Sequence, residues 1–201
     1  KIITRSALRN AITVNEAIGG STNAIIHLIA IAHEVGIKLD IETFDRIGRS
    51  TPHLVDAVPS GSVTMRAFQI AGGIPAVQKQ LEAQMDLDAI TVAGDTLRRS
   101  LDDARVWNED VIRPLNNPVN PQGGHAILKG SLAPGGAVVK AVGVPEPMMV
   151  HRGPARVFDD AFEARQAIID GRIVAGDVVV ARYEGPQGLP GMRESVHAIT
   201  Q

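Results

Sequence analysis

The sequence changes character around residues 111–122, and this change constrains the fold more than any other feature. The stretch "VIRPLNNPVNPQ" holds three prolines and three asparagines, which favour turns and loops over regular elements. Before it, apolar residues recur at helical spacing, whereas short β-rich runs separated by Gly and Pro follow it. The sequence therefore predicts a helix-rich region and a β-rich region joined by a linker.

The first region, residues 1–112, is expected to be mainly helical. Its clearest helix follows "AIGGSTN", with Ser21 or Thr22 as cap and Gly36 as the stop. Because this helix is apolar on most sides, it is predicted to be buried. Asn15 is a further candidate cap. More helices are expected at 41–47, 63–71, 75–85 and 95–104, with a short strand within 87–94.

The second region, residues 123–201, is predicted to form a β-barrel or sandwich with one inserted helix. The expected strands lie in "HAILKG", "GAVVKAVGV", "ARVF" and "DVVVARYEG". The helix begins after Asp159 or Asp160 and stops at Gly171. The fold class is thus α/β plus β, with domains at 1–112 and 123–201 and a linker at 113–122.

Charge and composition exclude several classes of protein. The net charge is −2 and Lys and Arg are not concentrated anywhere, which argues against a nucleic-acid partner. No apolar run is long enough to span a membrane, and the first residues lack the apolar core of a signal peptide. A cytoplasmic location is expected. The chain has no cysteine, so it supplies no thiolate ligand to zinc or to an iron–sulfur cluster.

The residues that precede the apolar helix form the first candidate site. Gly19 and Gly20 would let a ligand approach the backbone, and Ser21, Thr22 and Asn23 add polar side chains. Exposed amides at a helix N-terminus, with the helix dipole behind them, attract a phosphate or a carboxylate. The alternative is a tight Gly-Gly turn whose serine only caps the helix. The residues alone favour the cap.

A second candidate group lies on the helix itself. Asn23, His27 and Glu34 fall within about 40° of one another on a helical wheel. They either line a pocket or form a buried, hydrogen-bonded polar stripe, and the stripe is the favoured interpretation. His33 lies off this face and is expected to be structural or exposed.

Two further groups of polar residues lie in the second region. The loop "YEGPQGLPGMRES" carries Glu184 and Glu194 after a predicted strand, and carboxylates on a rigid loop suit Mg²⁺. A solvated loop would explain them equally well. The stretch "HRGPARVFDD" brings together His151, Arg152 and Arg156, where an arginine forms either a structural ion pair or a substrate contact.

Seven segments in this order carry a resemblance to a known family. They are "NEAIGGSTNAIIHLIAIAHEVGI", "DRIGRSTPHLVDAVPSG", "AGGIPAV", "LDAITVAGDTL", "DVIRPLNNPVNPQGGHAILKGSLAPGGAVVK", "HRGPARVFDD" and "GDVVVARYEGPQGLPGMRE". Together they strongly resemble the dihydroxy-acid dehydratase and 6-phosphogluconate dehydratase family, which includes sugar-acid dehydratases. The resemblance extends from about Asn10 to Glu194.

The resemblance implies a hydro-lyase that converts a small 2,3-dihydroxy acid into a 2-keto acid. In such enzymes an iron–sulfur cluster polarises the leaving hydroxyl, Mg²⁺ holds substrate oxygens, and a serine alkoxide takes the C2 proton. It also implies a homodimer or higher oligomer. The motifs favour the branched-chain dihydroxy-acid enzymes of amino-acid biosynthesis, with sugar-acid (aldonate) dehydratases as the alternative.

The family's functional residues map only in part onto this chain. Glu194 matches the Mg²⁺-ligating glutamate, whereas the cluster cysteines lie upstream and the serine base downstream, and Ser195 is no substitute. The sequence therefore resembles an internal piece, the end of the cluster-bearing α/β domain and the first strands of a C-terminal β-barrel. Alone, it is expected to be inactive and to bind no iron.

The acid's carboxylate also gives Ser21, Thr22 and Asn23 a ligand, so they are the predicted substrate-binding residues. Two alternatives of other classes remain open. One is a non-catalytic ligand-binding or interaction module that keeps the fold. The other is a nucleotide- or sugar-phosphate-binding protein that uses the Gly-rich helix start.

Overall fold

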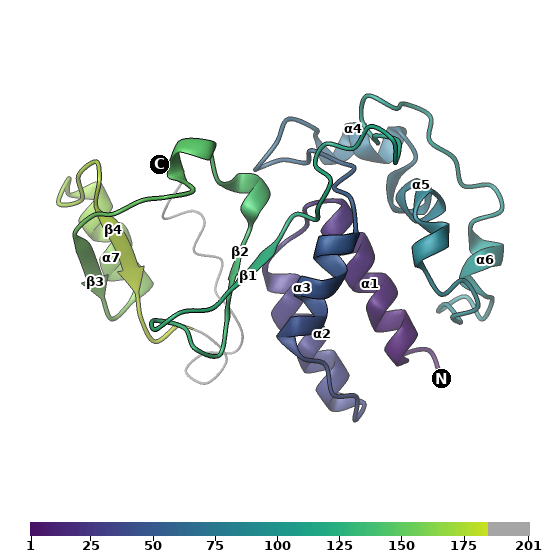
Figure 1. The fold of residues 1–201 in the computed structure, drawn as a ribbon, viewed down its shortest axis with the longest axis horizontal. Coiled ribbons are helices and arrows are strands. Elements are labelled where there is room, and N and C mark those ends of the chain that lie inside the picture. Colours follow the sequence, from purple (N-terminus) through teal and green to yellow (C-terminus); the bar gives the residue numbers. More distant parts are fainter. Residues whose placement is uncertain (185–201) are drawn as a thin grey trace. The chain divides into compact units, whose positions relative to one another are not determined.

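The computed structural model describes residues 1–184. The chain divides into two compact units, Lys1–Val144 and Pro145–Gln201, and each is described by itself (Figure 1). Together they contain helices and two small sheets, which is a mixture of α and β structure. Within the described part of the chain, no helix has the length and apolar character needed to cross a membrane.

The first unit is built mainly from helices. They are α1 (Arg5–Ala17), α2 (Asn23–Glu34), α3 (Ile41–Ser50), α4 (Met65–Ile70), α5 (Gly73–Gln80) and α6 (Leu97–Ser100), with 3₁₀ turns at Glu82–Gln84 and Ala141–Gly143. Strands β1 (Ala126–Leu128) and β2 (Ala137–Val139) pair antiparallel, with Ile127 opposite Val138. Helix α1 contacts α2, α3 and α5, and α3 contacts β1, so α1 is central to this unit (Figure 1).

The predicted helices at 41–47, 63–71, 75–85 and 95–104 are confirmed as α3 to α6, most of them shorter than expected. The strand expected within 87–94 is wrong, because Ile90 makes only an isolated bridge with Thr96. Helix α1 was not singled out from the sequence. Asn15 lies inside it and does not cap a helix; Thr4 caps α1 instead, accepting the N–H of Ala7.

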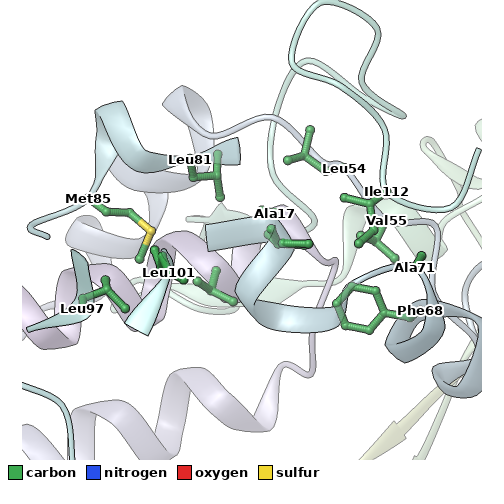
Figure 2. Packing of buried hydrophobic residues seen from close by; sticks show 13 residues of the cluster. Ala17, Leu54, Val55, Phe68, Ala71, Leu81, Met85, Leu97, Leu101 and Ile112 are labelled. Carbon is green, nitrogen blue, oxygen red and sulfur yellow. The ribbon is translucent and has the colours of Figure 1, made fainter. Parts of the chain in front are cut away.

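Two apolar clusters form the core of the first unit. The larger one gathers side chains from α1, α4, α5, α6 and the connecting loops (Figure 2). Its fully buried members include Ala17, Leu54, Val77, Leu81 and Ile112. The smaller cluster consists of Ile12, Ile25, Phe44 and Ile47. Helix α1 contributes to both clusters, so it connects them.

Helix α2 is much less buried than its composition predicts. Only Ile25 and Ala32 are buried, and Ile31 is 42% exposed. The prediction of a buried helix is therefore wrong for this structure. The physical reason is that α2 packs on one side, against α1 and the smaller cluster to which α3 contributes Phe44 and Ile47, and most of its remaining surface is half-buried or exposed.

The Pro- and Asn-rich stretch at 111–122 carries no helix or strand. It is nonetheless packed into the first unit, since Ile112 is fully buried and the Asn120 carbonyl accepts the N–H of His53 at 2.9 Å. The boundary between the two compact units does not lie in this stretch but after Val144.

The second unit contains strand β3 (Ala155–Phe158), helix α7 (Ala161–Ile169) and strand β4 (Val178–Ala181), after a 3₁₀ turn at Glu146–Met148. The strands pair in parallel with Ala155 opposite Val178, and α7 contacts both. The expected strands and helix are thus present, with Asp160 as cap of α7. Residues 1–184 form two separate two-stranded sheets and no closed barrel.

Candidate functional site

The turn between α1 and α2 explains the two glycines. Gly19 has a φ of +54°, a conformation that residues with a Cβ rarely adopt. Gly20 N–H donates to the Asn15 backbone carbonyl at 2.9 Å, and a Cβ on Gly20 would lie 2.1 Å from the side-chain Oδ1 of Asn15 and 3.3 Å from that carbonyl oxygen. The geometry of this turn therefore requires both glycines, whether or not it binds a ligand.

The polar residues after the glycines combine a cap with free donors. Ser21 lies one residue before the N-cap, and its Oγ accepts the N–H of Asn23, the first residue of α2, at 3.2 Å. Thr22 occupies the N-cap position of α2 and makes no side-chain cap bond. Within residues 1–184 the backbone N–H groups of Ser21 and Thr22 have no acceptor. Two amide donors at the positive end of α2 are thus available to an anion.

A groove of about 540 Å³ begins beside this turn and runs between α1, α2 and α5. Its lining is mainly aliphatic, with polar groups from Asn15, His27 and Gln78. The lining residues are Ala11, Val14, Asn15, Ile18, Ala24, His27, Leu28, Ile74 and Gln78. The buried Nδ2 of Asn15 has no partner among the described residues. An apolar recess next to free amide donors can hold a small molecule with an acidic and an aliphatic end.

The favoured interpretation of Asn23, His27 and Glu34 is wrong. His27 and Glu34 are exposed, so they form no buried polar stripe. Of the three, only His27 lines the groove. His33 is also exposed, which agrees with one of its two predicted roles. The shared helix face was identified correctly, but no neighbouring element buries it.

A buried carboxylate–imidazole pair, which was not predicted from the sequence, lies beside the turn and contacts it through the Gly20 carbonyl. Glu16 Oε1 lies 3.1 Å from Nδ1 of His125, and both side chains are 1% exposed. The Nε2 of His125 lies 3.1 Å from the carbonyl oxygen of Gly20. The sequence signal for this pair is a glutamate on the apolar side of α1. It can be recognised only when the bounds of α1 are known.

His53 lies against the same turn. Its ring is buried, and neither ring nitrogen has a hydrogen-bond partner among the described residues. The ring lies so close to Gly19 that a Cβ on this glycine would be 2.7 Å from Nε2. Burial lowers the pKa of His53 below its ordinary value, and the charge of Lys140 lowers it further. Desolvation likewise lowers the pKa of Lys140. Both groups thus favour their neutral forms more than they would in water.

The polar residues of the second unit take part in local structure. Arg156 forms an ion pair with Asp177 at 3.1 Å, so the structural alternative holds for this arginine. His151 contacts the carbonyl of Gly176. Glu184 accepts the N–H of Ala161 at 3.0 Å. That bond and the Asp160 cap satisfy donors at the start of α7.

The described residues, 1–184, form no site for a metal ion or an iron–sulfur cluster. The chain contains no cysteine, so it cannot supply thiolates to an iron–sulfur cluster. Within residues 1–184, no three His, Asp or Glu side chains come together as a metal-binding group. Glu194, the predicted Mg²⁺ ligand, lies outside the described residues.

Comparison with known proteins identifies the family to which this sequence belongs. Residues 1–100 match the N-terminal model of the dihydroxy-acid/6-phosphogluconate dehydratase family, and residues 110–201 match its C-terminal model. The chain therefore belongs to this family of dehydratases. The resemblance found in the sequence motifs is confirmed.

The similar curated proteins are called dihydroxy-acid dehydratase. The one from Ignicoccus hospitalis is 53% identical over 98% of this chain, and the one from Halothermothrix orenii is 50% identical over 96%. Dihydroxy-acid dehydratase 1 of Methanosarcina acetivorans is 46% identical over 98% of the chain. The chain spans only about 36%, 35% and 36% of these proteins' lengths, respectively.

Proposed function

We propose that this chain is part of a hydro-lyase that dehydrates a small 2,3-dihydroxy carboxylic acid to a 2-keto acid. The observation that carries the proposal is the match of both family models in sequence order, together with 53% identity to a dihydroxy-acid dehydratase across 98% of the chain. Because the chain spans about a third of such relatives, the activity belongs to a longer protein that contains it.

In this proposal, the turn before α2 binds the carboxylate of the acid. The free N–H groups of Ser21 and Thr22 and the side chains of Thr22 and Asn23 are the donors. The positive end of α2 adds a favourable field. The adjoining aliphatic groove accepts the carbon chain of a branched dihydroxy acid better than the hydroxyl-rich chain of a sugar acid.

The catalytic groups themselves come from outside this chain. Cysteines elsewhere in the protein would hold the iron–sulfur cluster, and a serine elsewhere would act as base. Glu194 is the one residue that we assign to Mg²⁺. Two-stranded sheets such as β1–β2 and β3–β4 leave unpaired edges, which further strands of a C-terminal β-barrel would cover. We further propose a cytoplasmic homodimer or higher oligomer.

The proposal is tested by turnover. The complete dehydratase should convert 2,3-dihydroxyisovalerate to its 2-keto acid with a higher kcat/KM than an aldonic acid such as gluconate. A reversed preference would assign the protein to the sugar-acid branch of the family. Absence of turnover of both acids by a preparation loaded with metal would favour a non-catalytic ligand-binding module.

A further inference from the structure

The Glu16–His125 pair joins α1, the loop before β1 and the Gly-rich turn by consecutive hydrogen bonds. Glu16 Oε2 accepts the backbone N–H of His125 at 3.1 Å, and Oε1 faces Nδ1 of the same residue at 3.1 Å. The opposite ring nitrogen, Nε2, faces the Gly20 carbonyl at 3.1 Å. Among residues 1–184, no other donor reaches this carbonyl oxygen.

The proton positions along this series of hydrogen bonds follow from which atoms can donate and which can only accept. A carbonyl oxygen only accepts, so Nε2 of His125 must carry a proton to bond with Gly20. Nδ1 then either accepts a proton from a protonated Glu16 or carries a second proton opposite the carboxylate. In both forms Glu16 occupies Nδ1 and keeps the Nε2–H directed at Gly20. The pair therefore fixes the ring's orientation and protonation at Nε2.

We infer that Glu16 and His125 are positioning residues for the anion-binding turn. Gly20 directly precedes Ser21 and Thr22, whose N–H groups are free. A fixed Gly20 carbonyl fixes the peptide plane that contains the Ser21 N–H. The pair thus aims the first donor of the turn before a ligand arrives. This inference rests on the proposed function, because it assumes that the turn contacts the substrate.

The burial of the pair makes the effect specific. Both side chains are 1% exposed, so water cannot replace a lost partner. Removing the Glu16 carboxylate leaves Nδ1 and the backbone N–H of His125 unpaired, and the ring is then free to turn. A glutamine, in contrast, keeps both bonds: its oxygen accepts the backbone N–H and its amide donates to Nδ1, which leaves the proton on Nε2.

The first test reads the ring directly. Nitrogen-15 NMR of histidine side chains in the complete dehydratase should show His125 protonated at Nε2, in the wild type and in Glu16→Gln. Glu16→Met should lose that signature and should shift the amide signals of Ser21 and Thr22. A wild-type His125 that is unprotonated at Nε2 would overturn the inference.

The second test separates positioning from stability by steady-state kinetics with 2,3-dihydroxyisovalerate. Glu16→Met should raise KM about tenfold with a smaller change in kcat, because a misaligned donor weakens the hydrogen bond to a charged group, whereas Glu16→Gln should stay within about twofold of wild type. Glu34→Met on the exposed side of α2 is the matched control and should leave KM unchanged. A less stable Glu16→Met variant with unchanged KM would overturn the inference.

A double variant, Ser21→Ala with Thr22→Gly, separates this inference from the proposed function. If it raises KM while Glu16→Met does not, the turn binds substrate and only the positioning role fails. If neither variant changes KM, the proposed role of the turn fails as well, and the positioning role falls with it.

Discussion

Helices α1 and α2 are neighbours, yet burial in them is opposite to what their compositions suggest. Helix α1 carries Asn10, Thr13 and Glu16 among its seven buried residues. Helix α2 is almost wholly apolar over "NAIIHLIAIA", and only Ile25 and Ala32 are buried. Burial in this protein therefore depends on which elements surround a helix and which partners its polar groups find, more than on composition.

The three buried polar residues of α1, Asn10, Thr13 and Glu16, each have a partner, whereas Nδ2 of the half-buried Asn15 has none among residues 1–184. Asn10 donates to the carbonyl of Asp86 at 2.8 Å and accepts its N–H at 2.9 Å. Thr13 donates to the Arg9 carbonyl, and Glu16 binds His125. Since buried polar groups are costly only when they are unpaired, α1 can lie between two apolar clusters despite its composition.

Helix α2 has apolar surface that no described element covers. The proposal that the chain acts inside a longer dehydratase accounts for this surface, because the relatives are nearly three times as long as the matched region. An apolar face of this kind is expected to be buried against another part of such a protein.

The largest expected difference between the helices concerns apolar side chains. Ile12→Ala on α1 removes a fully buried side chain of the smaller cluster and should lower the free energy of unfolding by about 2–5 kcal/mol. Ile31→Ala on α2 should cost less than about 1 kcal/mol. Chemical denaturation of the 201-residue chain measures both. Equal losses would contradict the comparison.

A smaller difference is expected at the two N-caps. Thr4 accepts the N–H of Ala7 at the start of α1, whereas Thr22 makes no cap bond. Thr4→Ala should therefore destabilise the chain by about 1 kcal/mol, and Thr22→Ala by less than about 0.5 kcal/mol. Thermal unfolding of the two variants in parallel tests the difference. A larger loss for Thr22→Ala would show that its hydroxyl caps α2.

The smallest expected effect is a dependence on acid. The pKa of His53 is lowered in the folded state by burial, so below its ordinary value of 6.5 the unfolded chain takes up a proton that the folded chain resists. Stability should therefore fall as the pH drops below about 6.5. His53→Leu should flatten this decline between pH 7 and 5, and His33→Leu, at an exposed position, should not. Parallel declines in both variants would contradict the assignment.

The sequence predicted helices better than it predicted their surroundings. Periodicity and caps located α3 to α7, because caps such as Thr96 and Asp160 act within a few residues. Burial of α2 could not be predicted, since it depends on contacts between distant segments. The Ile90 bridge shows the same limit for short β-rich runs, whose apolar residues suit a turn as well as a strand.

The candidate site was only partly predictable for the same reason. The motif "GGSTN" marked the turn and its donors, because a helix start has a local signature. Glu16 and His125 are 109 residues apart, and no spacing rule joins them. The groove needs α1, α2 and α5 together, so it also appears only in three dimensions.

The proposed binding of the acid by the turn before α2 is best tested by substrate kinetics of Ser21→Ala/Thr22→Ala in the complete dehydratase. We expect KM for 2,3-dihydroxyisovalerate to rise about tenfold with little change in kcat, because the variant loses the Thr22 hydroxyl that donates to the carboxylate and the Ser21 Oγ that holds the N–H of Asn23. An unchanged KM accompanied by a lower free energy of unfolding would contradict it and leave these residues as a cap alone.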